Sequence, residues 1–292
     1  MLVLTRKRVL SLLLLPLLGG LLVTCGSNSK AKSPTQSNPE EWEIPGWNLV
    51  WQDEFSASQV DLTKWEYEVN ADGGGNNELQ YYTARPENSF IENGHLVIRA
   101  LKESYTSNGQ TREYTSARMR TLQKGDWLYG RIEVRAKLPY GQGLWPAIWM
   151  LPTDWVYGGW AASGEIDIME LLGHEPYKVY ATLHFGGQWP NNQHSSAGTY
   201  ELQSGTFAGD FHTFALEWER EEMRWYVDGT HYGTMNQWSS DNQPYPAPFD
   251  KRFHLLLNVA VGGNWPGNPD LTTVFPQQME VDYVRVYEKA TP

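Results

Sequence analysis

The amino-acid sequence predicts an all-β protein, built as a sandwich or barrel of many short strands. From residue 42 onward no long stretch has the periodicity of a helix, and short alternations of apolar and polar residues recur instead. Gly, Asn, Asp and Pro separate these runs, and such residues favour turns. The sequence has no internal repeat and no sign of a second domain, so we expect one fold domain over residues 42–290.

The expected strands follow one another along this domain. Asp228-Gly229 is a dipeptide that favours a two-residue hairpin turn, so the runs on either side of it should pair. The runs with the clearest alternation cover residues 95–100, 130–136, 213–218, 223–228, 253–259 and 281–287.

Aromatic residues are unusually numerous, with 14 Trp, 16 Tyr and 9 Phe. Trp is large and is rarely buried completely, so one domain is not expected to place all of them in its core. The composition therefore predicts both a large aromatic core and an exposed aromatic surface that can stack on the apolar faces of sugar rings.

The chain is acidic, with a formal net charge of −11. Residues 1–24 contain three basic and no acidic residues, so the remaining 20 basic and 34 acidic residues give the rest of the chain a charge of −14. A nucleic-acid partner would need a basic surface, and an anionic polysaccharide would be repelled. A neutral glycan fits this charge better.

The N-terminus has the pattern of an export signal. Three basic residues precede an apolar run over residues 9–23, which is short and is interrupted by Pro16 and Gly19-Gly20. This pattern is typical of a signal peptide and not of a membrane-spanning helix. We therefore expect residues 1–24 to be a signal peptide and the protein to be exported.

Cys25 is the single cysteine and follows the apolar run directly, which excludes an intramolecular disulfide. Residues 22–25, Leu-Val-Thr-Cys, match a bacterial lipobox, and lipidation of Cys25 would make the protein a cell-envelope lipoprotein whose membrane contact is the anchor alone. Thr24 departs from the smaller residue usual before the cysteine, which leaves plain secretion open. Residues 25–41 then form the lipidated cysteine and a polar, flexible tether.

Three acidic residues, Glu165, Asp167 and Glu170, lie in one predicted strand. In a regular strand alternate residues share a face, so Glu165 and Asp167 face one way while the isoleucine after each faces the core. Glu170 is out of phase with them. One extra residue, Met169, in a β-bulge would return Glu170 to the face of the other two.

Such a trio suits hydrolysis of a glycosidic bond with retention. About four strand steps, or ~13 Å, separate the Cα atoms of Glu165 and Glu170, and inward-leaning side chains would close part of this gap towards the ~5 Å between carboxyl groups that a retaining glycosidase needs. Asp167 would raise the proton affinity of both neighbours, and the three would titrate as a unit. The alternative is a solvated edge strand whose acids merely face water.

The pattern Glu-x-Asp-x-x-Glu resembles the active-site strand of glycoside hydrolase family 16 in its bulged form. Other stretches resemble bacterial laminarinase-like members of this family, in order, along almost the whole predicted domain. They are WQDEF (residues 51–55), NNELQYY (76–82), LPYGQGLWPAIWM (138–150), NVAVGGNWPG (258–267) and DYVRVY (282–287).

The resemblance implies a β-jelly-roll sandwich of two curved antiparallel sheets, a concanavalin A-like fold, with substrate crossing the concave face. It assigns Glu165 as nucleophile, Asp167 as assisting residue and Glu170 as general acid/base. The implied activity is endo-hydrolysis of β-1,3-glucosidic bonds in laminarin-type β-glucans, with no cofactor in catalysis. The expected partner is a β-glucan polysaccharide, and the chain is expected to be a monomer.

Other functions stay open from the sequence. The same machinery could accept mixed-linkage β-1,3-1,4-glucan, and a non-catalytic β-glucan-binding module could share the fold. The intact trio of acids argues against pure recognition, because a binding module has no use for three crowded carboxylates. Another specificity of the family, such as agarase, carrageenase or transglycosylase, is a third alternative, although an acidic domain suits sulfated glycans poorly.

The resemblance also points to aromatic contacts with substrate. Trp145 and Trp149 alternate with apolar residues, and the family places both on the cleft face as stacking platforms, although both could instead belong to the core. Trp160, just before the carboxylate strand, and Trp265, in a Gly-rich loop, are further candidates. Loops often carry binding groups, but a loop Trp can also simply cover a sheet edge.

Three polar residues complete the expected substrate site. Asn77 and Arg118 resemble the family's contacts to sugar hydroxyls, although Asn77 follows Gly73-Gly74-Gly75 closely and could serve only as a turn former. His184 lies in a run where family members keep a His near the acids. In such a strand it could equally be a satisfied core residue.

A structural Ca²⁺ on the convex side is expected from the same resemblance. Glu54, the backbone carbonyl of Gly94, and Asp282 match the positions of its ligands, and oxygen ligands suit calcium. The sequence shows no Cys/His cluster with zinc spacing and no nucleotide-binding fingerprint.

Overall fold

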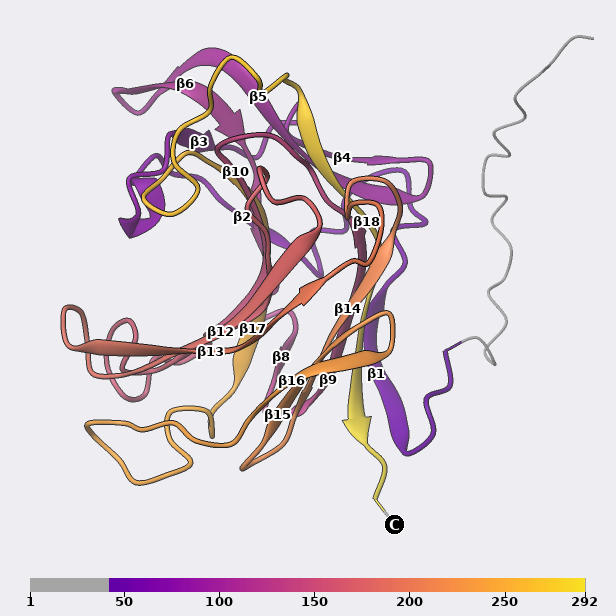
Figure 1. The fold of residues 1–292 in the computed structure, drawn as a ribbon, viewed down its shortest axis with the longest axis vertical. Helices are drawn as coiled ribbons and strands as arrows, with labels where there is room; N and C mark the ends of the chain where they lie inside the picture. The colour runs from indigo at the N-terminus through magenta and orange to yellow at the C-terminus, as the bar shows by residue number, and fades with distance from the viewer. Residues whose placement is uncertain (1–41, 292) are drawn as a thin grey trace, which may run out of the picture. The chain divides into compact units, whose positions relative to one another are not determined.

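The computed structural model describes residues 42–291 as two β-sheets packed face to face (Figure 1). Among these residues the strands pair antiparallel, except that β3 (Gln80–Tyr82) runs parallel to β6 (Gln110–Ser116). The predicted sandwich of two curved antiparallel sheets is confirmed, with this one parallel pair as its departure. The predicted signal peptide, Cys25 and the tether lie outside the described residues and stay predictions.

One sheet has ten strands and the other eight. The ten-stranded sheet contains, from edge to edge, β16 (Thr230–Met235), β15 (Met223–Val227), β14 (His212–Trp218), β9 (Gly130–Lys137), β18 (Gln277–Lys289), β5 (His95–Ser107), β6 and β3, with β1 (Trp47–Asp53) beside β18 and β4 (Ser89–Glu92) beside β5. The eight-stranded sheet contains β13 (Asn192–Glu201), β12 (Lys178–Gly186), β11 (Glu165–Glu170), β10 (Leu144–Pro152), β17 (Phe253–Val261), β7 (Arg118–Arg120) and β2 (Glu66–Glu68), with β8 (Asp126–Trp127) beside β17. A short 3₁₀ turn covers Gly73–Gly75.

The predicted strands are all present, and the hairpin has the expected turn. Val227 pairs with Thr230, and the two residues between them, Asp228 and Gly229, both have positive φ, at 49° and 75°. This is the backbone that a two-residue hairpin of matching twist requires. Asp228 therefore belongs to the turn and not to the end of the preceding strand.

The hydrophobic core lies between the two sheets and is strongly aromatic. Trp65, Trp218 and Trp225 are completely buried, which accounts for part of the high Trp content. Strand β17, near the middle of the eight-stranded sheet, is buried along its whole length. Its apolar sequence is typical of a strand that is covered on both faces.

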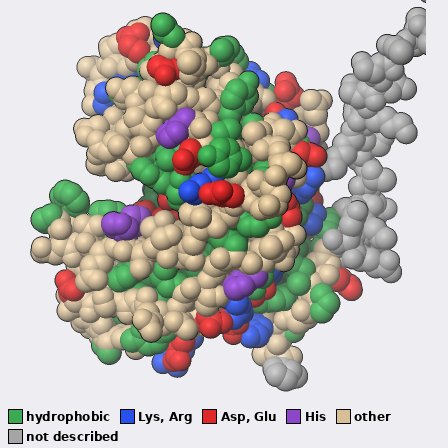
Figure 2. Space-filling view, in the orientation of Figure 1, with side chains coloured by type: hydrophobic (Ala, Val, Ile, Leu, Met, Phe, Trp, Pro, Cys, Tyr) green, Lys and Arg blue, Asp and Glu red, His purple; other side chains and the backbone are tan. Residues whose placement is uncertain are grey.

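The eight-stranded sheet is curved, and its outer face is hollowed. In Figure 1 strands β10, β12 and β17 bend around an open space on the left of the view. The space-filling view shows a hollow on the same side, with protein above and below it (Figure 2). We call this hollow the cleft. Among residues 42–291, no helix is long and apolar enough to span a membrane.

Candidate active site

Strand β11 lies between β10 and β12 and places its isoleucine and acidic side chains on opposite faces of the sheet. Ile166 and Ile168 are buried in the core between the sheets. The three acids take the opposite face, so they line the cleft, although each is mostly buried by its neighbours. The side chain of Glu165 is 14% exposed, whereas Asp167 and Glu170 are only 3% and 9% exposed.

The β-bulge predicted between the second and third acid is present. Between Asp167 and Glu170 the register with β12 shifts, so Ile168 and Met169 stand opposite a single residue of β12. Against β10, Met169 keeps a partner and Ile168 is unmatched. The extra residue is therefore not Met169 alone, because both residues share the bulge and both point into the core.

Each outer acid accepts a hydrogen bond from a different tryptophan. Trp160 donates its indole N–H to Glu165 Oε2 at 2.8 Å, and Trp145 donates to Glu170 Oε1 at 2.9 Å. The sequence predicted these two tryptophans as sugar contacts, and the structure places both at the acids. Their indole groups therefore orient the carboxylates, a role that sequence reasoning missed.

His184 lies on β12 directly opposite Glu165. Its Nε2 is 3.3 Å from Asp167 Oδ2 and 3.6 Å from Glu165 Oε1. Its ring also packs against the indole of Trp160, with centroids 5.4 Å apart. The structure thus brings His184 to the acids, as predicted, and not into the core.

Burial and mutual repulsion shift the pKa values of this cluster upward. Burial first, and then the neighbouring Asp167, raise the pKa of Glu165 to about 7. The pKa of Glu170 is raised well above its usual value by burial and by the charges of Asp167 and Glu165. Burial lowers the pKa of His184, but the hydrogen bond and charge of Asp167 and the other two acids outweigh this and raise it to about 9.

These shifts divide the roles of the two glutamates. At neutral pH His184 is a cation beside Glu165, so it favours the ionised form of this glutamate. Burial and the charges of Asp167 and Glu165 favour the protonated form of Glu170. Two carboxyl groups in one site whose environments push their proton affinities apart are the arrangement needed for one nucleophile and one general acid.

Trp149 lies beside the acids on the same face and belongs to a polar network. Its indole N–H donates to Asn258 Oδ1 at 2.7 Å, and the amide of Asn258 donates to the hydroxyl of Tyr82 at 3.2 Å. The guanidinium of Arg118 lies over the rings of Trp149 and Tyr82, with centroid distances of 5.2 and 4.5 Å. Arg118 therefore lies beside Trp149 on the cleft face, and its contact with sugar hydroxyls stays a prediction. The role of Asn258 was not foreseen.

Arg118 is held by acids from two other segments. It lies 3.4 Å from Glu68 and 3.7 Å from Glu78. Burial lowers the pKa of Arg118, but Tyr82 and the two acids raise it by a larger amount. The guanidinium thus stays charged and fixed, and it can offer N–H donors at the end of the cleft formed by β7 and β2.

Trp265 and Tyr180 form an aromatic edge near Glu170. The ring of Trp265 meets that of Trp145 at 5.4 Å and that of Tyr180 at 5.1 Å, both nearly perpendicular. Trp265 is 41% exposed, so it can still present a ring surface to the cleft. Tyr180 was missed, although it has the same alternation along β12 as His184 and stands opposite Glu170.

Comparison with known proteins agrees with this geometry. Residues 76–285 match the family described as "Glycosyl hydrolases family 16". The chain belongs to this family. It is 46% identical over 269 residues to "Glucan endo-1,3-beta-glucosidase A1" of Niallia circulans, covering 86% of this chain but only 39% of that protein. It is also 46% identical over 253 residues to "Beta-glucanase" of Rhodothermus marinus, covering 84% of this chain and 86% of that protein.

Solved structures of family 16 proteins share the fold. The laminarinase catalytic domain from Thermotoga maritima superimposes with a TM-score of 0.75 at 44% identity, covering 84% of this chain and 99% of that one. The resemblance inferred from the carboxylate motif and the accompanying stretches is therefore confirmed. So is the jelly-roll fold that it implied.

The structure places Asn77 in a turn, where its side chain contacts another loop. It has a positive φ of 58°, the backbone of a turn former. Its side-chain amide donates to Asn264 Oδ1 at 2.9 Å, which links its loop to the loop that carries Trp265. In this family 16 chain Asn77 therefore has the turn role that was the alternative prediction. A contact between Asn77 and sugar stays a prediction.

Two of the three predicted calcium ligands, Glu54 and Asp282, are paired with cations in the structure. Glu54 accepts two hydrogen bonds from Arg285, at 2.8 and 2.9 Å. Asp282 accepts one from Arg135 at 2.7 Å and lies 3.4 Å from His95 Nε2. Ca²⁺ at this place would have to displace these guanidinium groups from both carboxylates.

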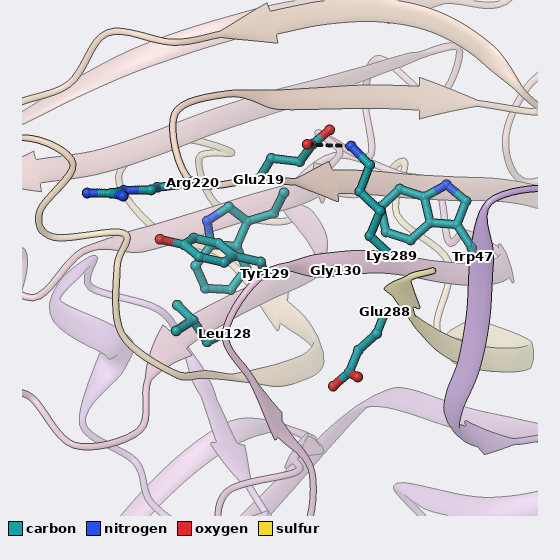
Figure 3. Close-up of a pocket in the computed structure, with 9 residues that line it drawn as sticks. Trp47, Leu128, Tyr129, Gly130, Glu219, Arg220, Glu288 and Lys289 are labelled. Carbon is teal, nitrogen blue, oxygen red and sulfur yellow. Dashed lines mark hydrogen bonds and ion pairs between the residues drawn. The ribbon is translucent and has the colours of Figure 1, made fainter. Parts of the chain in front are cut away.

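A separate cavity of about 240 Å³ lies away from the acids. Figure 3 shows Tyr129 and Leu128 together on one side of it, and Trp47 with Lys289 on the other, where Lys289 pairs with Glu219. None of the three family 16 acids or their hydrogen-bond partners lines it. We therefore assign the chemistry to the open cleft, which has the acids, and not to this cavity.

Proposed function

We propose that this chain is a retaining endo-β-1,3-glucanase that acts on laminarin-type β-glucans. The observation that carries the proposal is the trio Glu165, Asp167 and Glu170 on the cleft face of β11, with the two glutamates held by separate indole donors. The relatives reported above are named as glucan hydrolases, which supports the class of substrate.

In the first step Glu165 attacks the anomeric carbon, and Glu170 gives its proton to the departing glycosidic oxygen. A covalent glycosyl–enzyme bond forms as the glycosidic bond breaks. In the second step Glu170, now ionised, removes a proton from water, and the water oxygen attacks from the side that the leaving group occupied, opposite Glu165, and displaces Glu165. Two displacements at one carbon give net retention.

Asp167 and His184 support these two reaction steps without forming a bond to a reacting atom. Asp167 lies between the two glutamates in the strand and faces His184 at 3.3 Å. A protonated His184 beside Glu165 favours the ionised nucleophile before attack. Asp167 in turn favours the protonated state of its neighbours, which keeps a proton available on Glu170.

Chemical rescue tests the proposal. Glu165→Ala should abolish turnover of every glucan, because no second nucleophile is in place. Glu170→Ala should lose activity on natural glucan but retain it on an aryl β-glucoside of low leaving-group pKa, and added azide should give a β-glycosyl azide. The time course of product anomers by NMR is decisive, since the α-anomer as first product would exclude retention.

The choice between laminarin-type and mixed-linkage glucan is made by a polysaccharide panel. Reducing-sugar release should be fastest on laminarin-type β-1,3-glucan. Binding to laminarin with no release of reducing ends would instead indicate the non-catalytic binding module. The chain spans 39% of the length of the Niallia circulans protein, so the panel is best run on this chain alone.

We further propose that the enzyme is a monomer at the cell envelope, anchored through Cys25. The support is the lipobox-like sequence after the apolar run at the N-terminus. Wild-type protein should fractionate with membranes, and Cys25→Ser should release it or block its processing. Catalysis should be unchanged, because the tether precedes the described domain. Wild-type protein that is wholly soluble outside the cell would exclude the anchor.

A structural Ca²⁺ bound through Glu54, Gly94 and Asp282 stays a proposal based on the family resemblance. The arginine pairs of both carboxylates oppose it. The test is the melting temperature with excess EDTA and with added Ca²⁺. A rise with Ca²⁺ that Asp282→Asn abolishes would support the site, and an unchanged melting temperature would exclude it.

A further inference from the structure

We propose that Glu165, Asp167 and His184 form an inhibitory site for a transition-metal ion of the Zn²⁺ or Cu²⁺ type. The three side chains each offer one ligand atom, and these atoms all lie within 4.8 Å of one another. Only the effect on activity rests on the proposed function, because metal binding can be measured without substrate.

The distances fit a small tetrahedral ion. His184 Nε2 lies 3.6 Å from Glu165 Oε1 and 3.3 Å from Asp167 Oδ2. Bonds of about 2.0–2.2 Å from zinc to nitrogen and oxygen place neighbouring tetrahedral ligands roughly 3.3–3.5 Å apart. Two edges of the polyhedron are therefore already set in the free protein, and binding requires only that the oxygens of Glu165 and Asp167, which lie within 4.8 Å of each other, reach the same spacing.

A buried oxygen in this cluster is only partly satisfied. Asp167 is 3% exposed, and its Oδ2 lies 3.3 Å from His184 Nε2 as an ion pair but has no hydrogen bond of good geometry with the described residues. Such an oxygen is costly to bury. A cation placed between Asp167, Glu165 and His184 would satisfy it and would also reduce the repulsion between the two carboxylates.

Neighbouring residues orient Glu165 as a metal ligand, and the cleft leaves room for a water molecule as the fourth ligand. Trp160 holds Glu165 by Oε2, so Oε1 remains directed to the cluster. This is the outer hydrogen bond that metal-binding side chains commonly have. Glu165 and His184 are both half-buried, so a water molecule from the cleft can complete the coordination.

The set of ligands selects the type of metal. One imidazole with two carboxylates suits Zn²⁺ and Cu²⁺, whereas Ca²⁺ and Mg²⁺ prefer six or more oxygen ligands. Because the ion must replace the proton of His184, binding should be reversible and weaker than at a structural zinc site. A metal held on Oε1 of Glu165 would block attack at the anomeric carbon, so bound metal should stop turnover.

Calorimetric titration with ZnCl₂, in a buffer that does not chelate zinc, tests the proposal. Wild-type protein should bind one Zn²⁺, and MgCl₂ should give no comparable signal. His184→Gln and Asp167→Asn should each weaken binding at least ~10-fold. The matched control is His194→Gln, since His194 is exposed and its ring centroid lies 5.7 Å from that of His184. This control should bind like wild type.

Three results would overturn the proposal. They are no zinc binding by wild type, unchanged binding by His184→Gln, and a loss in His194→Gln as large as that in His184→Gln. If His184→Gln fails to fold, the visible spectrum of wild-type protein with Co²⁺ decides, because intense tetrahedral bands are expected and weak octahedral ones contradict the site. Zinc binding without any glucanase activity would refute the proposed function alone, and glucanase activity insensitive to zinc would refute this site alone.

Discussion

Trp160 and Trp145 hold the two glutamates by their indole N–H groups at 2.8 and 2.9 Å. Hydrogen bonds to charged groups contribute about 1.5–3 kcal/mol, roughly twice the value for neutral pairs. A glutamate side chain has several rotatable bonds, so a fixed donor restricts where its carboxylate points. These two tryptophans therefore act as positioning residues in addition to any stacking on sugar.

Replacing either tryptophan by phenylalanine separates the two roles. Trp160→Phe and Trp145→Phe keep an aromatic ring but lose the donor, so kcat should fall ~10–100-fold, corresponding to a lost hydrogen bond to a charged group. KM should change much less. Steady-state kinetics on laminarin measure both, with Trp47→Phe, in the distant cavity, as the control. A rise in KM at constant kcat would instead indicate a pure stacking role.

The pH dependence of kcat/KM should report the cluster. Glu165 must be ionised to attack, and its pKa is raised to about 7, so activity should fall as the pH drops below about 7 and not only near 4.5. Asp167→Asn removes a charge that raises this pKa, so the acid limb should move to lower pH. The rate should fall less than in Glu165→Ala.

Asp210→Asn, at an exposed position, is the control for that experiment and should leave the limb where it is. The limb reports the coupled cluster and not one residue. A wild-type profile flat down to pH 5 would show that burial does not perturb the nucleophile as the structure indicates.

The element that brings the acids together is a strand with a defined beginning and one bulge. Gly164 precedes Glu165 and has a φ of 89°, which side chains rarely adopt. A Cβ atom there would lie 2.8 Å from the ring of Phe249 and 3.0 Å from that of Phe253. The glycine thus allows β11 to start against the core, which fixes the position of Glu165.

Gly164→Ala should therefore destabilise the protein and reduce activity. Strain at positive φ and crowding against two rings should together cost about 2–4 kcal/mol, or a fall of roughly 5–15 °C in melting temperature. Gly205→Ala is the matched control, because its φ is 79° but nothing lies within 4 Å of the added atom. Equal melting temperatures for the two variants would refute the close contact.

Local sequence periodicity predicted most of this element, and distant contacts explain what it missed. Alternation identified the face of Glu165 and Asp167, and the phase of Glu170 required a bulge. Periodicity could not divide that bulge between Ile168 and Met169, since both are apolar and both fit the core. It could not foresee Asn258, which meets Trp149 across 109 positions. Nor could it foresee Arg285, which lies 231 positions away in the sequence and donates hydrogen bonds to Glu54.

At the scale of the whole molecule, the two faces of the eight-stranded sheet must satisfy opposing requirements. Its inner face packs the core, and its outer face holds the three acids, among which burial and neighbouring charge raise the pKa values of Glu165 and Glu170. The rest of the fold must supply the stability that this cluster removes. The large aromatic core between two extended sheets is the source of that stability.

If burying Glu170 destabilises the folded protein, the substitution Glu170→Gln should raise its stability, and this gain should depend on pH. Because the pKa of Glu170 is raised in the folded state, the folded protein binds its proton more tightly than the unfolded chain. Stability from this group is complete below about pH 4.5 and is lost as the pH rises through the folded pKa. Glu170→Gln carries no such loss, so its melting temperature should equal that of wild type at pH 4 and exceed it by a few degrees at pH 8.

Differential scanning calorimetry of both proteins across this range measures the difference directly. Glu87→Gln, at an exposed position, is the control and should follow wild type at every pH. Other carboxylates, such as Glu217 and Glu280, have lowered pKa values and stabilise the fold in the opposite sense, but they are common to all three proteins and cancel in the comparison. A constant difference between Glu170→Gln and wild type would mean that packing, and not ionisation, causes the change. A difference that grows with pH would locate the stability penalty in the same proton that the proposed mechanism transfers.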